Sequence, residues 1–262
     1  MEEFNYKKKY GQNFLQDQNI LNKIANLIPI AEDDLIIEIG PGNGKLTASL
    51  VKHHSYYLAY EIDKDVKKYL DKYINDKVQI NYQDFLTADI NEDIKNIPFN
   101  NLYIIANIPY YITTPILTKI INSHIPVSKQ VIMVQKEMAR RLAAAPGSKL
   151  YGRVTAYLNC YCRITKMFDV PRSCFKPIPN VDSSVLLLEK DYKMSGIDEQ
   201  VLHNLIRDAF QFKRKQLKNN LKAYDLKKIE SILKKYNLDL TCRAEEISIE
   251  IFIDIVRVLG HK

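Results

Sequence analysis

The chain has 262 residues, of which 46% are apolar, and a formal net charge of +7. This length fits either one large α/β domain or a domain of about 190 residues with a small appendage, and the composition is that of a globular protein. No apolar run approaches the ~20 residues of a membrane span, and residues 1–5 lack an apolar signal core. We therefore expect a cytoplasmic protein, and neither a membrane protein nor a secreted one.

The positive charge favours a polyanionic partner. The predominance of Lys among the basic residues weakens this interpretation. Of the 38 basic residues, 29 are Lys, and the chain is also rich in Asn, Ile and Tyr. An AT-rich genome would produce the same bias, so the position of the charges matters more than their sum. The four cysteines show no paired CxxC spacing, which predicts a reduced protein without a structural metal.

From residue 31 onwards, short apolar runs alternate with amphipathic stretches. The runs predict strands at 35–39, 56–62, 78–82, 102–107, 131–135 and 184–188. The stretches predict helices at 45–52, 64–74, 115–122 and 136–144. This alternation predicts an α/β fold with a parallel sheet that is covered on both faces, in which ligands bind beyond the carboxyl ends of the strands.

Two later segments are predicted to be helical. Cys160 and Cys162 are expected to pack on neighbouring turns of a helix. The composition changes near 190–196, and only helical periodicity follows, at 198–212, 215–223, 226–236 and 247–259. This pattern predicts a small all-helical C-terminal domain.

A glycine-rich turn, EIGPGNG at 38–44, follows the first predicted strand. Such a turn lets the backbone approach a ligand closely and directs helix N–H groups at it. The spacing is not the G-x-G-x-x-G of dinucleotide-binding proteins, so Gly40 and its neighbours could instead admit the methionine part of S-adenosylmethionine (SAM). The alternative is a tight turn between two packed elements.

Two carboxylates follow the next two strands and favour the cofactor site. Glu61 ends the second strand, where it can accept hydrogen bonds from both ribose hydroxyls of a nucleoside. Asp84 follows the third strand and can accept a hydrogen bond from the adenine amino group, with Phe85 or Ile62 beside the ring. Either acid alone would be an ordinary strand-end residue. Together with the glycine turn, they supply in order the residue types that one nucleoside needs.

The sequence NIPY at 107–110 follows the fourth strand and predicts a site for a planar base. The side-chain oxygen of Asn107 and the carbonyl of Ile108 could accept both hydrogens of an exocyclic amine and direct its lone pair at a methyl group. Pro109 would fix the turn, and Tyr110 would stack on the base. The alternative is an Asn-capped turn with a buried tyrosine.

With these motifs in place, the chain resembles the small-subunit ribosomal RNA adenine dimethyltransferases essentially from end to end. The similar blocks are 9–15, 38–44, 107–110, 133–153, 170–183 and 209–221. The sister family, which methylates large-subunit RNA and confers macrolide resistance, shares the central motifs. The blocks 146–153 and 210–221 are similar to the small-subunit group instead.

The resemblance implies roles for particular residues. Asn13 and Leu15 would close over SAM, with Gly40 at its methionine end, and Asn107 would serve both cofactor and target. Phe175 would form the second face of a sandwich around the target adenine, opposite Tyr110. From the sequence alone, Phe175 lies in a stiff, proline-rich loop, where an aromatic residue is more often buried packing.

A basic segment in the C-terminal region is a candidate RNA surface. The stretch 203–222 contains six basic residues and one acid. We expect Lys213, Arg214, Lys215 and Lys218 to contact phosphates. The segments 7–9, 140–141 and 149–153 add positive charge. The alternative is a solvated helix face.

The resemblance therefore implies two domains. Residues 1–190 would form a Rossmann-like, SAM-binding catalytic domain, and residues 191–262 a helical RNA-binding domain. The implied activity is N6,N6-dimethylation of two adjacent adenines near the 3′ end of small-subunit ribosomal RNA, by a monomer that acts on the small ribosomal subunit. Two rivals stay open: a large-subunit RNA adenine methyltransferase, and a non-catalytic RNA-binding assembly factor.

Overall fold

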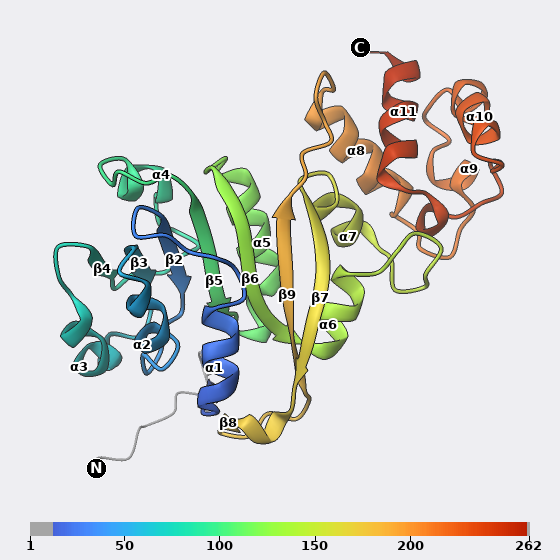
Figure 1. The fold of residues 1–262 in the computed structure, drawn as a ribbon. Coiled ribbons are helices and arrows are strands. Elements are labelled where there is room, and N and C mark those ends of the chain that lie inside the picture. The colour runs from blue at the N-terminus through green and yellow to red at the C-terminus, as the bar shows by residue number, and fades with distance from the viewer. Residues whose placement is uncertain (1–12, 261–262) are drawn as a thin grey trace. The chain divides into compact units, whose positions relative to one another are not determined.

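The computed structural model describes residues 13–260 (Figure 1). The chain divides into two compact units. Unit 1 comprises Met1–Ala139 and Thr165–Glu189, and unit 2 comprises Arg140–Ile164 and Lys190–Lys262. The expected boundary near residue 190 is one of three points at which the chain passes between the units. Residues 140–164, which were expected in the first domain, pack with the C-terminal helices.

A seven-stranded sheet forms the centre of unit 1, in the order β4-β3-β2-β5-β6-β9-β7. Its strands are β2 (Leu35–Ile39), β3 (Tyr56–Tyr60), β4 (Val78–Asn81), β5 (Leu102–Asn107), β6 (Val127–Gln135), β7 (Cys162–Val170) and β9 (Ser183–Lys190). The pairs among β4, β3, β2, β5 and β6 are parallel. All five residues of β2 are buried, as expected of a central strand that is covered on both faces.

Two details of the sheet correct the sequence-based expectations. β9 pairs with β6 in the antiparallel direction, so the sheet is mixed rather than parallel. Cys160 and Cys162 do not lie on one helix, because the helix before them ends at Leu158, Cys160 lies in the turn that follows and Cys162 begins the strand β7. Most residues of β7 are at least partly exposed, so it lacks the apolar run that marks the other strands.

A second, two-stranded sheet lies outside the main one. It joins β1 (Phe14–Leu15) to β8 (Phe175–Lys176), with Leu15 opposite Phe175. This pairing brings the start of the described chain to a segment that lies about 160 positions later. It fixes the position of Asn13, which immediately precedes β1.

Short helices connect the strands of unit 1. They are α1 (Gln18–Ala25), α2 (Thr47–Leu50), η2 (Val51–His53), η3 (Lys64–Val66), α3 (Lys67–Leu70), η4 (Asp71–Tyr73), α4 (Ile90–Ile94), η5 (Tyr110–Ile112), α5 (Thr113–Asn122) and η6 (Arg172–Cys174). α6 (Lys136–Leu142) spans the division between the units. The N–H groups of Asn19 and Ile20 donate to the Asp17 side chain, which starts α1.

The helices cover both faces of the sheet (Figure 1). Buried residues of α1, α2 and α3 share one apolar cluster with alternate residues of β5, such as Tyr103 and Ile105. In Figure 1, α1 lies in front of the sheet and α5 behind it. The α/β class and the Rossmann-like arrangement expected from the sequence are confirmed.

Unit 2 is helical around its own apolar core. It contains α7 (Arg153–Leu158), α8 (Glu199–Ala209), α9 (Leu217–Asn220), α10 (Leu226–Lys235), η7 (Ala244–Glu246) and α11 (Ile249–Leu259). Asp198 and Asp225 cap the amino ends of α8 and α10 through their side chains. The buried face of α11, centred on Phe252, packs with residues of α7, α8 and α10.

Candidate active site

The glycine-rich turn lies directly after β2, at the carboxyl edge of the sheet. Gly40, Gly42 and Gly44 have φ angles of +71°, +56° and +75°, which side chains other than glycine adopt only with strain. The N–H of Gly40 donates to the carbonyl of Tyr60 at 2.9 Å, which ties the turn to the end of β3. The backbone conformation of the turn therefore favours glycine at these three positions.

Gly42 has a second requirement besides its φ angle. A Cβ atom built at this position would lie 2.2 Å from Cε1 of the Phe14 ring, far closer than any real contact. Phe14 is itself buried, with 8% of its surface exposed. The missing side chain of Gly42 therefore makes the space in which Phe14, from β1, packs onto the turn.

Glu61 is held by backbone donors immediately after β3. One carboxylate oxygen accepts from the N–H of Gly42 at 2.8 Å, and the other accepts from the N–H of Asp63 at 2.8 Å. Burial raises the pKa of Glu61, whereas the hydrogen bonds from Asp63 and Gly42 act to lower it. The carboxylate is thus oriented before any ligand binds, with lone pairs remaining on both oxygens.

Asp84 follows β4 by three residues and is partly buried. Its Oδ1 accepts from the N–H of Leu86 at 2.9 Å. Phe85 is buried beside it and meets the Tyr60 ring edge-on, with centroids 5.3 Å apart. An acid and an apolar wall therefore stand next to each other at this strand end, as adenine recognition requires.

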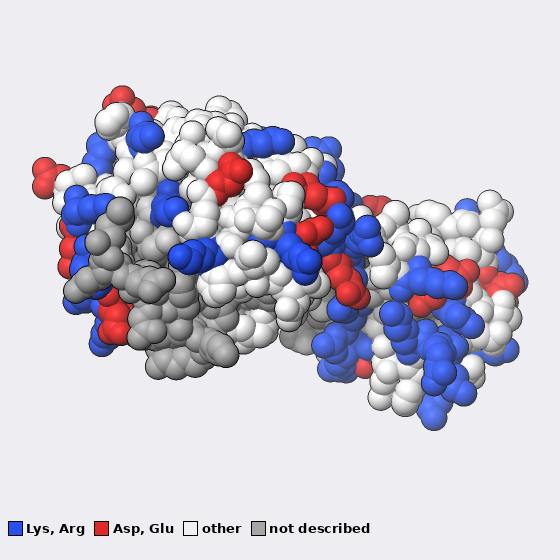
Figure 2. Space-filling view, turned by 90° about the horizontal axis from the view of Figure 1, so that it is seen from below, with Lys and Arg blue, Asp and Glu red and all other residues white. Residues whose placement is uncertain are grey.

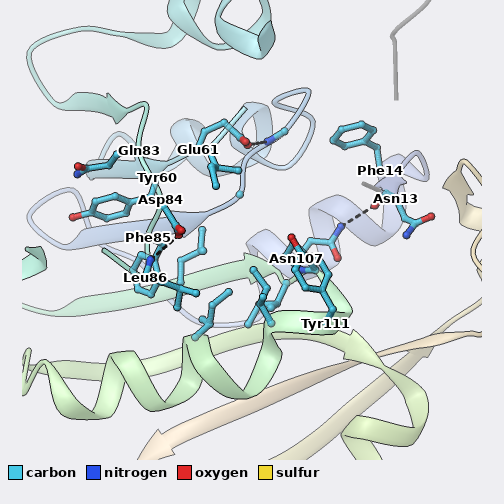
Figure 3. Close-up of a pocket in the computed structure, with 18 residues that line it drawn as sticks. Asn13, Phe14, Tyr60, Glu61, Gln83, Asp84, Phe85, Leu86, Asn107 and Tyr111 are labelled. Carbon is cyan, nitrogen blue, oxygen red and sulfur yellow. Dashed lines mark hydrogen bonds between the residues drawn. The ribbon is translucent and has the colours of Figure 1, made fainter. Parts of the chain in front are cut away.

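Asn107 is the last residue of β5, and its amide is held in a defined orientation. The Nδ2 group donates to the carbonyl of Asn13 at 3.2 Å, so the side-chain oxygen faces away from Asn13. The N–H of Ile108 donates to the carbonyl of Met133 at 3.1 Å, which extends the pairing of β5 with β6 by one step. Figure 3 shows the contact between Asn107 and Asn13 as a dashed line.

These residues surround one pocket of about 220 Å³ (Figure 3). The pocket belongs wholly to unit 1. Six of the residues predicted for the site line it: Asn13, Gly40, Glu61, Asp84, Asn107 and Ile108. Ile62 and Phe85, the predicted neighbours of the adenine ring, line it as well. Residues from the ends of β2, β3, β4 and β5 thus converge on one space.

Two predicted residues lie elsewhere. Phe175 is only 2% exposed and does not line the pocket, because it packs in the apolar cluster of unit 1 together with Leu15. Leu15 lines a separate cavity of about 30 Å³ behind the glycine turn, which it shares with Gly40 and Asn107. Leu15 and Phe175 pair where β1 meets β8, and contacts of Leu15 with SAM and of Phe175 with a base stay predictions.

Two further predictions fall partly outside the described residues. Tyr110 begins η5, but its side chain is not among those that the structure describes. The basic segment 7–9 and the start of the block at 9–15 also lie outside the described range. Stacking by Tyr110 accordingly stays a prediction.

The pocket also contains residues that the sequence-based reasoning missed. Phe14, Gln83, Leu86 and Tyr111 line it, and Tyr111 is 63% exposed. Phe14 and Tyr111 each adjoin a predicted residue, and that adjacency is the signal that could have identified them. Phe14 reaches the pocket only because β1 pairs with β8, which no local pattern indicates.

The buried carboxyl group of Glu38, at the start of the glycine-rich turn, connects the elements on either side of that turn. Glu38 accepts hydrogen bonds from the hydroxyls of Thr47, at 2.8 Å, and Tyr57. Burial raises the pKa of Glu38 to about 7, against the opposing effect of these two hydrogen bonds. Since Thr47 begins α2, this network ties the helix that follows the turn to the strand that precedes it.

The predicted phosphate contacts lie in unit 2. Lys213, Arg214, Lys215 and Lys218 are all exposed. Within the described part of the chain, no ion pair engages any of the four. Lys and Arg predominate on the face of unit 2 that Figure 2 presents. The four side chains thus form an exposed cationic surface, whereas Arg207 of the same basic segment is paired with Asp208.

Residues 13–260 contain neither a metal-binding cluster nor a membrane-spanning helix. No group of His, Cys, Asp and Glu side chains there could hold a metal ion. No helix in that range is long and apolar enough to cross a bilayer.

Comparison with known proteins identifies the class. The family model described as ribosomal RNA adenine dimethylase matches residues 3–260. The chain belongs to this family, as its resemblance to the adenine dimethyltransferases indicated.

Curated relatives and solved structures agree with this assignment. The ribosomal RNA small subunit methyltransferase A of Mycoplasma mobile is 44% identical over 95% of this chain and 96% of its own. The protein of the same name from Lactococcus lactis is 39% identical over 98% and 91%. A dimethyladenosine transferase from Plasmodium falciparum superposes with a TM-score of 0.77 at 25% identity, over 92% of this chain and 95% of its own. The 23S rRNA methyltransferase ErmE gives 0.74 at 22% identity, which shows a shared fold alone.

Proposed function

We propose that this protein is a SAM-dependent enzyme that places two methyl groups on each of two adjacent adenines near the 3′ end of small-subunit ribosomal RNA. The observation that carries the proposal is the position of Asn107 at the end of β5. Its amide is fixed by Asn13, at the wall of a pocket whose other strand ends supply Glu61 and Asp84. Family membership and the small-subunit relatives support the choice of reaction and RNA.

The residues of the pocket fit the groups of SAM. Glu61 has the acceptor oxygens that two ribose hydroxyls need, and Asp84 has one for the adenine amine. Ile62 and Phe85 supply apolar surface for the ring, and Gly40, with nothing within 4 Å of a built Cβ, leaves room for the methionine end. When bound, SAM supplies a methyl group on a positively charged sulfonium.

The chain's own residues then position the target amine. Its lone pair is delocalised into the adenine ring, so the amine is a weak nucleophile. The Asn107 oxygen and the Ile108 carbonyl can accept its two hydrogens, which favours a pyramidal nitrogen and stabilises the positive charge that would develop on it as the methyl carbon passes from sulfur to nitrogen. The sulfur would leave as a neutral thioether, and the nitrogen would release one of its hydrogens as a proton. Ile108 is itself buried and lines the pocket next to Asn107.

The basic segment of unit 2 would supply the affinity for RNA that does not depend on sequence. Lys213, Arg214, Lys215 and Lys218 are exposed cations that can contact phosphates. We place the enzyme in the cytoplasm as a monomer, acting on the small ribosomal subunit. Its proposed substrate is found there, and one chain contains every residue that the mechanism uses.

The proposal is tested by offering labelled SAM and separated ribosomal subunits from cells that lack this modification. We expect label in small-subunit RNA and none in large-subunit RNA. Label in the large subunit would favour the macrolide-resistance type of enzyme. Tight binding to the small subunit without transfer would favour a non-catalytic assembly factor.

A further inference from the structure

An exposed aromatic side chain lies inside the basic segment of unit 2. The loop between α8 and α9 contains residues 211–215, all of them exposed. Phe212 is 56% exposed and immediately precedes Lys213, Arg214 and Lys215. Folding does not require an exposed apolar ring beside three cations, since a polar residue could occupy this position equally well. The exposure of Phe212 therefore indicates a contact with a partner.

Phe210, two residues earlier, shows what a structural aromatic residue does at this point of the chain. Its ring lies 6.2 Å from that of Tyr151 and 6.3 Å from that of Phe252, and it packs against the core of unit 2. Phe212 has no ring partner among the described residues. The segment therefore anchors itself through Phe210 and leaves Phe212 outside the core.

Hydrogen bonds hold the backbone at Phe212 in place. The Nδ2 group of the buried Asn220 donates to the carbonyls of Ala209, at 2.6 Å, and Phe212, at 3.3 Å. The N–H of Lys215 donates to the same carbonyl of Phe212 at 2.9 Å. Since the loop is already ordered, the ring can contact a ligand without the entropy cost of fixing the backbone.

We infer that Phe212 stacks on an unpaired base of the RNA, while the adjacent cations contact the phosphates on either side of it. An aromatic face beside a basic groove is the combination that binds single-stranded nucleic acid. A base inside a duplex is already stacked on both faces, so only a loop, a bulge or a single-stranded segment offers one. The inference rests on the proposed function and specifies the kind of RNA element that unit 2 recognises.

The test compares RNA affinity for Phe212→Ala, Phe212→Trp and the wild type over several salt concentrations. The probe is small-subunit RNA with unpaired nucleotides, and a fully paired RNA of equal length serves for comparison. Phe212→Ala should weaken binding of the first RNA about tenfold, equivalent to ~1.4 kcal/mol, and leave the second unchanged. The log–log salt slope should stay that of the wild type, because no charge is removed. Phe212→Trp should retain the affinity.

Tyr236→Ala, which removes a 39% exposed aromatic ring of the same unit, is the control and should leave RNA affinity unchanged. An affinity of Phe212→Ala within twofold of wild type, or an equal loss on paired RNA, would overturn the inference. So would a loss seen only with the intact subunit and not with naked RNA, which would assign Phe212 to a protein contact. Methyl transfer by the wild type shows separately whether the proposed function holds.

Discussion

Asn107 is the residue proposed to contact both SAM and the target adenine. Its amide nitrogen is engaged by the Asn13 carbonyl, and the opposite orientation would set two oxygens against each other. The oxygen is therefore held in one direction without help from a ligand. Positioning of this kind acts on the rate of the chemical step more than on substrate affinity.

We expect Asn107→Ala to remain folded and to transfer methyl groups at least a hundredfold more slowly. Removal of one preorganised hydrogen-bond partner typically costs ~2.7–4 kcal/mol in the transition state. Single-turnover rates at saturating SAM are the measurement. Asn101→Ala, just before the amino end of the same strand, is the control and should keep a near-normal rate. A rate for Asn107→Ala within about threefold of wild type would remove the positioning role.

Glu61 should matter for one ligand only. Glu61→Ala removes the carboxylate that is proposed to bind the ribose, so SAM affinity should fall by more than tenfold while RNA affinity stays unchanged. Glu61→Gln retains one acceptor oxygen for the Gly42 N–H and should lose less. Calorimetric titration of each ligand separates these cases. Unchanged SAM affinity in Glu61→Ala would exclude the residue from the cofactor site.

Glu38 should make stability depend on pH. Its pKa is raised from 4.5 to about 7 in the folded protein, so folding favours the protonated form. Stability from this group is fully present below pH 4.5 and is lost as the pH rises through 7, by about 3 kcal/mol in all. Glu38→Gln should flatten urea-unfolding profiles between pH 5 and 8. Glu61 acts in the same direction, so some slope should remain. Equal slopes in both proteins would refute the assignment.

The glycine-rich turn 38–44 and the strand β1 are coupled through direct contacts. Phe14 packs where Gly42 lacks a side chain, and Asn13, one residue earlier, orients Asn107. A change in the turn should therefore reach Asn13 and Asn107, which line the pocket proposed for SAM, through β1.

Gly42→Ala tests this coupling, because its Cβ would displace the Phe14 ring. We expect SAM affinity at least tenfold weaker and a loss of ~1–3 kcal/mol in stability from the strained φ angle alone. Gly196→Ala is the control, since Gly196 has a φ of +72° and nothing within 4 Å of a built Cβ. It should lose similar stability and keep its SAM affinity. Equal SAM affinity in the two variants would show that the contact with Phe14 is irrelevant to binding.

The sequence predicted the central strands and the strand-end residues because both depend on local patterns. Buried parallel strands leave continuous apolar runs, and an acid directly after such a run lies at the carboxyl edge of the sheet. β7 has sheet neighbours on one side only and is largely exposed, so it lacks a continuous apolar run and was not predicted as a strand. β1 and β8 have two residues each, too few for any periodicity. The places of Phe14 and Phe175 depend on their long-range pairing and could not be predicted.

At the scale of the whole molecule, chemistry and RNA affinity are assigned to different units. The pocket belongs to unit 1, and the exposed basic segment to unit 2. Residues 140–164 pack within unit 2 although they precede the last strands of unit 1 in the chain. Composition alone could not predict that residues 140–164 belong to unit 2, because no marked change in residue types sets them apart from the flanking stretches.

Replacing Lys213, Arg214, Lys215 and Lys218 together with Gln should weaken RNA binding and flatten its salt dependence. Each phosphate contact that is lost should reduce the log–log slope by about 0.7–0.9. SAM affinity should not change, since none of the four lines the pocket. The measurement is RNA affinity across several salt concentrations. A wild-type slope in the quadruple variant would mean that these charges are a solvated surface.

The identity and position of the methylated base test the proposed function more directly than any binding constant. Unmethylated small subunits are incubated to completion with SAM and the wild-type protein, and their RNA is digested and sequenced by mass spectrometry. We expect N6,N6-dimethyladenosine at two adjacent adenines near the 3′ end and no other newly modified base. A product that stops at one methyl group, a methylated base of another type, or an unmodified RNA would contradict it.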